Sequence, residues 1–146
     1  AAAVNDPAAL LADWRSGRAK QYLIARALDL RRRLPALFAA GDYVPVEAEG
    51  PLAEHVVAFL RRGAEAAVLV AVPRLARPFL RTDGPLGLDG AALRRRALRL
   101  PDWPHGADLG DALADREHAV GADGALPLDR LLETFPVALL CTGTAG

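Results

Sequence analysis

The hydrophobic period of the chain changes once, between Leu34 and Tyr43, and this change limits the folds open to it. Before Pro35, apolar residues recur every three or four positions, which is typical of an α-helix. From Tyr43 onward they alternate with other residues, which is typical of a β-strand. Pro35 cannot continue the hydrogen bonds of a helix but can open a short further turn, which Gly41 is suited to close. We therefore expect helices first and strands afterwards.

Two helices are expected before the change of period. The first begins with Asn5 or Asp6 as its N-cap, has Pro7 in its first turn, and ends near residues 16–17. The second spans residues 18–34 and is amphipathic. Its apolar side chains form one stripe, which consists of Leu23, Ala27, Leu30 and Leu34 and is widened by Ile24 and Leu28.

The remainder of the sequence indicates an antiparallel β-sandwich. Strands are expected at 43–49, 55–62, 65–72, 96–101 and 136–142, with turns at 50–51 and near Gly63. The strand at 65–72 is apolar on both faces, so it should be central in its sheet. Weak strand signals lie near Leu109 and Val120, and residues 126–135 indicate a short helix or turn. We divide the chain into a helical segment, residues 1–41, and a β-sandwich domain, residues 42–146.

Composition argues against several classes of function. The 146 residues carry 18 basic and 18 acidic side chains, so no overall field draws the chain to nucleic acid or to an anionic membrane. The longest apolar run, residues 66–72, is far too short to cross a bilayer. The one cysteine, Cys141, can form no disulfide within the chain, which favours a cytoplasmic location. The sequence contains no Met, so we expect it to be a piece of a longer polypeptide.

No residue pattern indicates catalysis, a cofactor or a metal. Ser16 is the only Ser and is expected to cap a helix. Cys141 lies in an apolar strand, where a thiol is usually buried and inert. His55, His105 and His118 lack metal-ligand spacing, and no glycine-rich phosphate-binding loop occurs. We therefore expect no catalytic, cofactor or metal site within this chain.

Two clusters of charged residues each allow two interpretations. The acidic cluster would surround a cation or supply paired carboxylates, although Asp beside Gly and Pro is also ordinary in turns. It consists of Asp102, Asp108, Asp111, Asp115 and Glu117. The basic cluster would contact phosphates, or it would guard a solvated strand edge, which we favour. It consists of Arg94, Arg95, Arg96 and Arg99.

The two tryptophans have different expected environments. Trp14 follows apolar residues at helical spacing and is expected in the core. Trp103 lies in a loop between Asp102 and Pro104, so its ring is expected to be exposed. An exposed indole can stack on a sugar, which makes Trp103 the candidate sugar contact.

The segment "LDLRRRLPALFAAGDYVPV", residues 28–46, resembles the junction between the catalytic barrel and the C-terminal β-domain of glycoside hydrolase family 13, the α-amylase family. In that family an L-R-x-x-x-P-A-L-x-x-G-x-Y segment occupies this junction. The stretches "WRSGRAKQYL", "GDYVPVEAEGPLAEHVVAFLRR", "VAVPRL" and "FPVALL" are similar to the C-terminal end of its malto-oligosyltrehalose synthases. The resemblance runs intermittently from Trp14 to Leu140. It weakens between Pro85 and Val120, where "LRRRALRLP" and "ALADREHAV" replace the strand and turn that the family leads us to expect.

The resemblance implies a parent enzyme that converts the reducing-end α-1,4 linkage of a malto-oligosaccharide to an α,α-1,1 linkage, using carboxylates of an upstream barrel. The chain would then be a non-catalytic accessory domain that includes the last barrel helix. Two other classes stay open, namely a carbohydrate-binding module for α-glucans with Trp103 as its platform, and a free-standing protein active in the loop 102–123. Without a barrel the stripe of the second helix would lack a partner, so we also expect a homodimer through residues 18–34.

Overall fold

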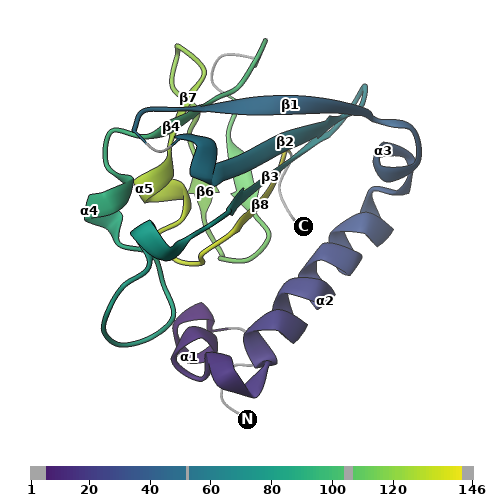
Figure 1. The fold of residues 1–146 in the computed structure, drawn as a ribbon. Helices are drawn as coiled ribbons and strands as arrows, with labels where there is room; N and C mark the ends of the chain where they lie inside the picture. The colour runs from purple at the N-terminus through teal and green to yellow at the C-terminus, as the bar shows by residue number, and fades with distance from the viewer. Residues whose placement is uncertain (1–5, 52, 104–106, 143–146) are drawn as a thin grey trace.

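The computed structural model describes residues 6–51, 53–103 and 107–142, and its N-terminal part is helical as expected (Figure 1). The helical elements are α1 (Pro7–Ala12), the 3-10 turn η1 (Trp14–Ser16), α2 (Arg18–Arg33) and α3 (Pro35–Ala40). Asp6 caps α1, because its carboxylate accepts a 3.0 Å hydrogen bond from the amide of Ala8. The alternative cap, Asn5, lies outside the described residues. Gly17 adopts a left-handed φ of 81° and joins η1 to α2.

The rest of the described chain is mainly strand. The longer strands are β1 (Asp42–Glu49), β2 (Val56–Arg62), β3 (Ala67–Pro73) and β8 (Ala138–Thr142). The shorter strands are β4 (Ala97–Arg99), β5 (Leu109–Asp111), β6 (Glu117–His118) and β7 (Ala125–Pro127). Single helical turns lie between them, namely η2 (Ala53–His55), η3 (Arg77–Phe79), α4 (Gly90–Leu93) and α5 (Leu128–Leu131). The five expected strands are confirmed, and β7 was not predicted because three residues are too few to establish a period.

Within the described residues the strands form one continuous antiparallel sheet in the order β6-β5-β8-β3-β2-β1-β4-β7. Strand β1 takes part in both halves of the sheet. Its residues 42–46 pair with β2, whereas residues 47–49 pair with β4. The sheet therefore curves at β1 and folds over itself (Figure 1). This architecture confirms the mainly antiparallel β fold class, with its two layers joined through β1.

The curved sheet separates two apolar clusters. The inner face contributes Leu60, Leu69 and Leu140 to the main core. The outer face contributes Val68 and Leu139 to a second cluster, which the N-terminal helices complete. Strand β3 supplies residues to both clusters, and it pairs with β2 on one side and β8 on the other. The prediction that this strand is central and apolar on both faces is confirmed.

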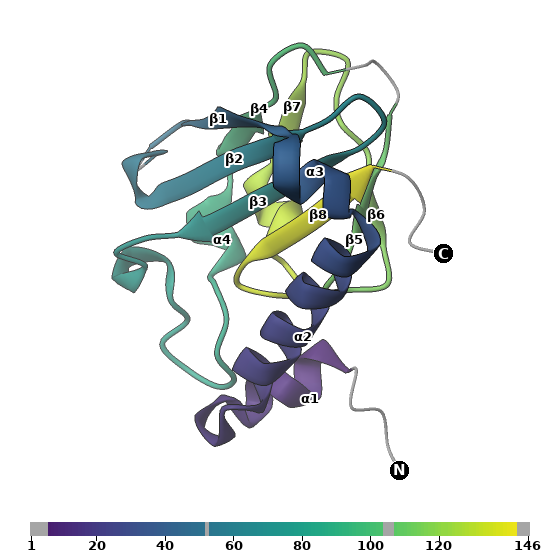
Figure 2. The same cartoon turned by 90° about the vertical axis from the view of Figure 1, so that its right-hand side faces the viewer.

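Helix α2 lies across the outer face of the sheet, in front of β8 and β5 (Figure 2). Leu30 is only 1% exposed there, and Leu23, Ala27 and Leu34 pack around it. The expectation that this stripe lacks a partner is therefore wrong, because the chain's own sheet covers it. Ile24 and Leu28, which widen the apolar stripe in the sequence, are exposed.

Helix α2, with 16 residues, is the longest helix in the described part of the chain. None of the helices in the described ranges combines the length and apolarity that a membrane span requires.

Candidate functional site

Helix α2 holds the turn after β5 through two long-range hydrogen bonds. The hydroxyl of Tyr22 donates to the carbonyl of Leu113 at 2.9 Å, and Nε of Arg26 donates to the carbonyl of Ala112 at 2.5 Å. Burial raises the pKa of Tyr22, Arg26 lowers it, and Asp111 raises it further. Tyr22 and Arg26 are four residues apart, so they share one flank of the helix. The sequence signal that could have predicted this contact is the four-residue spacing of these two polar side chains next to the apolar stripe.

The acidic cluster is dispersed in the structure. Asp111 is the last residue of β5 and its side chain is buried, and its Oδ1 accepts hydrogen bonds from the amides of Leu113 at 2.8 Å and Ala114 at 3.2 Å in the turn that follows. Its Oδ2 lies 3.4 Å from Nε2 of the buried His118. Asp111 therefore holds its own turn, which agrees with the turn interpretation.

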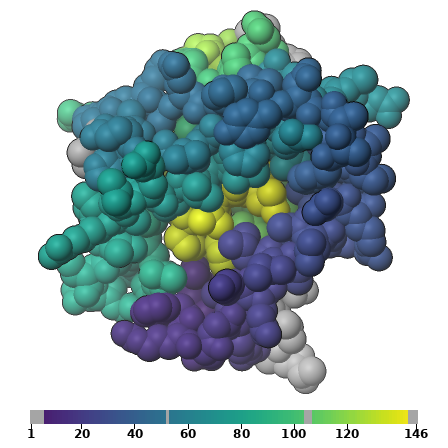
Figure 3. All heavy atoms as spheres, turned by 45° about the vertical axis from the view of Figure 1, so that its right-hand side comes forward, coloured from purple at the N-terminus to yellow at the C-terminus, as the bar shows by residue number. Residues whose placement is uncertain are grey.

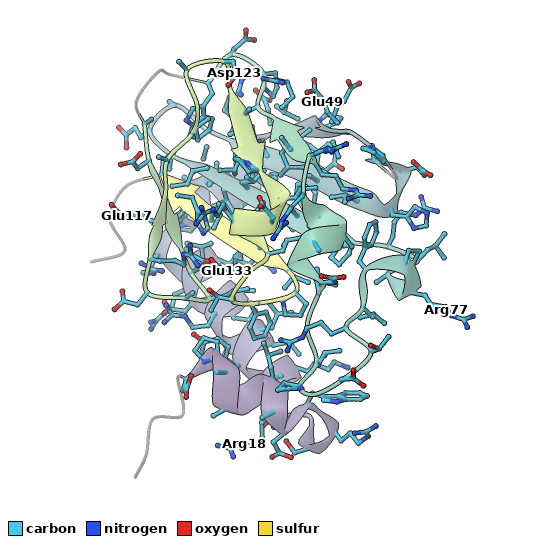
Figure 4. All side chains as sticks on the ribbon, turned by 90° about the vertical axis from the view of Figure 1, so that its left-hand side faces the viewer. Arg18, Glu49, Arg77, Glu117, Asp123 and Glu133 are labelled. Atoms are coloured by element: carbon cyan, nitrogen blue, oxygen red, sulfur yellow. The ribbon has the colours of Figure 1, made fainter. Side chains whose placement is uncertain are left out.

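The other members of the acidic cluster are Asp102, Asp108, Asp115 and Glu117, and all four are exposed. Figure 4 shows Glu117 and Glu133 on separate parts of the molecule from Glu49 and Asp123. Among the described residues, no group of three or more His, Cys, Asp or Glu side chains is arranged to hold a metal ion. His105, for which no metal spacing was found, lies outside them.

The basic cluster does not form one cationic surface. Arg96 is buried, with Nε donating to the carbonyl of Pro51 and the guanidinium 5.3 Å from the centre of the Phe79 ring. Arg94 and Arg95 are exposed. Strand β4 lies between β1 and β7, so the expectation of a solvated, charge-guarded strand edge is wrong.

Arg99 instead links three neighbouring segments within one half of the curved sheet. Its guanidinium contacts Glu49 of β1 at 2.7 Å and Asp123, which precedes β7, at 2.9 Å. The hydrogen bonds from Arg99 are the main cause that lowers the pKa of Glu49 and the pKa of Asp123. The arrangement is a surface ion-pair network that ties β1, β4 and the approach to β7 together. Sequence reasoning missed it because the three residues are far apart in the chain.

The tryptophans exchange their expected environments. Trp103 is 9% exposed and belongs to the main core, where its Nε1 donates to the carbonyl of Ala107 at 3.1 Å. The expectation of an exposed ring is wrong, whereas the sugar contact itself stays a prediction. Trp14 is 40% exposed, with the guanidinium of Arg15 lying 4.6 Å from its ring centre. Its expected core position is therefore also wrong.

The single serine and cysteine have structural positions. The hydroxyl of Ser16 donates to the carbonyl of Asp13 at 2.7 Å and accepts from the amide of Arg18 at 3.3 Å, beside the start of α2. Cys141 is buried in β8 beneath the helices, as expected. Burial raises the pKa of its thiol, although Arg33 opposes this effect and Asp111 adds to it.

His55, another residue considered in the sequence, lies next to a turn, with its Nδ1 3.1 Å from the carbonyl of Leu75.

Two hollows lie beside the N-terminal helices. One has a volume of about 280 Å³ and opens where α1, the loop 81–88 and residues 132–136 meet (Figure 3). Its lining includes the exposed Arg81 and Glu133 and the buried Phe135. The other is a groove of about 720 Å³ between α3 and the β2–β3 turn, with Leu34, Ala40 and Ala66 in its walls. The first has three charged residues, Asp6, Arg81 and Glu133, in a wall that is about equally polar and apolar, and the second is mainly apolar.

Comparison with known proteins gives a consistent result. No family model matches the chain. Proteins of two strains of Mycobacterium tuberculosis, CDC 1551 / Oshkosh and H37Rv, both named "Putative maltooligosyl trehalose synthase", are 39% identical over 128 residues. That match covers 86% of this chain and 14% of each relative. The solved structure of maltooligosyltrehalose synthase from Arthrobacter ramosus is similar with a TM-score of 0.61 at 32% identity, over 87% of this chain and 14% of that one.

Proposed function

Because the chain is homologous to a C-terminal region of the maltooligosyl trehalose synthases, we propose that it is a non-catalytic accessory region of such an enzyme. Its role is to stabilise the catalytic part that precedes it in the longer polypeptide. The chain spans 14% of the length of the relatives it matches, so most of the parent enzyme lies outside it. The helical segment, residues 1–41, is then the end of the catalytic barrel, and residues 42–146 are the C-terminal β-domain.

The parent enzyme in this proposal belongs to glycoside hydrolase family 13 and is an isomerase. It moves the reducing-end glucose of a malto-oligosaccharide from an α-1,4 to an α,α-1,1 linkage. Such chemistry needs one carboxylate as nucleophile and a second as general acid and base, about 5–5.5 Å apart. A cytoplasmic location belongs to the same proposal and is supported by the single cysteine, which forms no disulfide within the chain.

The observation that supports a non-catalytic role is the way carboxylates are used in the described chain. Asp111 binds backbone amides, Glu49 and Asp123 bind Arg99, and Glu133 lies 3.1 Å from Arg116. Each of these carboxylates is held by a group that stabilises its charge and fixes the local structure. The contacts of these four carboxylates are therefore accounted for by a structural role.

Activity measurements on maltopentaose test this proposal. The full-length synthase is expected to form the trehalose-terminated product, which is non-reducing, while the 146-residue chain at equal concentration forms neither that product nor glucose. Loss of reducing ends and chromatography of the products give the readout. Trehalose-terminated product from the purified chain would overturn the proposal and would favour activity within residues 102–123.

Glucan binding at Trp103 is the alternative role, and it has a separate test. Affinity electrophoresis in maltodextrin would retard the chain if it is a carbohydrate-binding module. Because Trp103 is buried, we expect no retardation. Retardation that a Trp103→Phe variant abolishes, in a chain that is still folded, would support the alternative.

A further inference from the structure

Two hollows on the surface share part of their walls. The first, of about 280 Å³, lies between α1, the loop 81–88 and residues 132–136. The second, of about 390 Å³, lies beside α4 and α5. Three residues line both of them, namely Leu88, Leu132 and Glu133, so the two hollows adjoin. We name the pair the double hollow, and an extended ligand can occupy both of its parts.

The charged side chains of the double hollow cancel each other. Three carboxylates and three guanidinium groups lie in its walls, namely those of Asp6, Asp129, Glu133, Arg81, Arg94 and Arg130. An anion would meet the carboxylates, and a cation would meet the guanidinium groups. A neutral ligand with many hydroxyl groups avoids both conflicts, because a hydroxyl donates to a carboxylate and accepts from a guanidinium group. The apolar residues Leu11, Leu86 and Leu132 can contact its C–H groups, so the wall suits a sugar chain.

Arg81 is the wall residue whose charged group is most open to a ligand. Among the described residues its guanidinium has no hydrogen-bond or ion-pair partner, so its five N–H donors are available. Its backbone amide donates to the carbonyl of Gly87 at 3.1 Å, which closes the loop 81–88. The amide of Leu86 donates to the carbonyl of Leu11 in α1 at 3.2 Å, and Figure 1 shows the loop beside that helix. The loop therefore presents an unpaired guanidinium from a hydrogen-bonded backbone.

The order of the elements places the double hollow near the active site of the parent enzyme. In the proposed function α2 is the last helix of the catalytic barrel, so α1 and η1 belong to the connection between the last barrel strand and that helix. In barrels of alternating strands and helices, these strand-to-helix connections form the face that carries the active site. Asp6, Ala8 and Leu11 of this connection line the first hollow. The double hollow therefore begins at the catalytic face.

We propose that the double hollow binds glucose units of the malto-oligosaccharide substrate on the non-reducing side of the reacting linkage. The inference rests on the proposed function, which supplies both the substrate and the barrel. The reaction changes the linkage at the reducing end, so the other glucose units of a long substrate extend out of the active site. Only substrates long enough to reach the double hollow gain from it. The synthase is therefore expected to favour longer chains.

The contact is weak in the isolated chain and effective in the synthase. Phe135 is the aromatic residue in the described part of the wall, and it is buried, so this wall offers no exposed ring for stacking on a sugar. The isolated chain should therefore bind maltodextrin too weakly to be retarded in a gel. In the synthase the active site already holds the substrate, which raises the effective concentration of the remaining glucose units at the double hollow to about millimolar.

Chain-length kinetics of the full-length synthase test the proposal. The measured quantity is kcat/KM for maltooctaose divided by kcat/KM for maltotetraose. Arg81→Gln should lower this ratio at least about five-fold through a higher KM for maltooctaose, because it removes binding that the ground state and the transition state share. Arg77→Gln is the matched control and should leave the ratio unchanged. Arg77 is exposed, is not among the wall residues of either hollow, and points into solvent in Figure 4.

Filling the first hollow gives a second arm. Ala8 and Ala9 are adjacent exposed residues of α1, and of the two Ala8 lines the hollow. Ala8→Trp should therefore lower the same ratio, while Ala9→Trp should not. Unfolding temperatures show whether each variant is folded, and Ala8→Leu takes the place of Ala8→Trp if the larger side chain unfolds the synthase.

An unchanged ratio in Arg81→Gln overturns the proposal. This includes an equal loss of kcat/KM on both substrates, which shows an effect on folding or on the reaction itself and not on distant glucose units. A ratio that falls as far with Ala9→Trp as with Ala8→Trp also overturns it, because the position of the site is then wrong.

The isolated 146-residue chain, assayed with maltopentaose, separates failure of this proposal from failure of the proposed function. An inactive chain together with an unchanged ratio in Arg81→Gln leaves the accessory role standing and removes the glucan site. An active chain removes the accessory role.

Discussion

The Leu30→Ala substitution should strongly destabilise the isolated chain, because α2 packs on the sheet through this side chain. Leu30 is 1% exposed, and the change removes three carbons from the cluster beneath α2. At about 0.8 kcal/mol per buried carbon the transfer loss is about 2.4 kcal/mol. The residual cavity raises the total to about 2.5–5 kcal/mol. With a urea m-value of about 2 kcal/mol/M, the unfolding midpoint should fall by about 1.2–2.5 M.

Leu28→Ala is the matched control on the same helix. Leu28 is 56% exposed, so the same change removes less than half of that burial and leaves no enclosed cavity. We expect a loss of about 1 kcal/mol or less, partly offset by the higher helix propensity of Ala. Urea unfolding followed by circular dichroism measures both variants. If Leu30→Ala costs no more than Leu28→Ala, then α2 does not pack on this sheet and the reasoning is wrong.

Three further predictions concern the sheet. Arg99→Met should weaken the pH dependence of the free energy of unfolding in acid. The lowered pKa values of Glu49 and Asp123 give stabilisation that is present above about pH 4–5 and is lost as the pH falls through the folded-state pKa values. The free energies of unfolding of parent and variant, measured by urea titration, should therefore converge at low pH. Cys141 should react with a thiol reagent only after unfolding, since it is 3% exposed and its pKa is raised; stoichiometric labelling of the native chain at neutral pH would contradict this. Gly50→Ala should cost about 1–3 kcal/mol, because φ is 101° and an added Cβ would meet the carbonyl of Arg95, whereas Gly90→Ala, with open space at Cβ, should change little in the same thermal melts.

The helices and long strands could be predicted because their side chains repeat with a clear period. Pro35 and Gly41 mark the change from helix to strand in the sequence, and in the structure α3 begins at Pro35 and β1 begins directly after Gly41. The apolar residues of β3 on both faces also predicted its central place. The short strand β7 contains three residues and was missed, because so short a segment shows no period.

The positions of single side chains were harder to predict, since they depend on partners distant in sequence. Trp103 lies in a turn-rich stretch but fills the main core, and Leu30 was expected to lack cover although its own sheet supplies it. Arg96 follows two exposed arginines and yet is buried against Phe79. For Leu30 and Arg96 the covering residues lie far along the chain, which local spacing cannot reveal.

The central claim is that this region stabilises the synthase without taking part in its chemistry. The most direct test is to measure the unfolding temperature and kcat of the full-length synthase carrying Leu30→Ala. The account predicts a lower unfolding temperature, with kcat per folded molecule within about two-fold of the parent at temperatures where both are folded, because the side chain supports packing and not catalysis. A kcat that falls ten-fold or more while the unfolding temperature stays unchanged would contradict it.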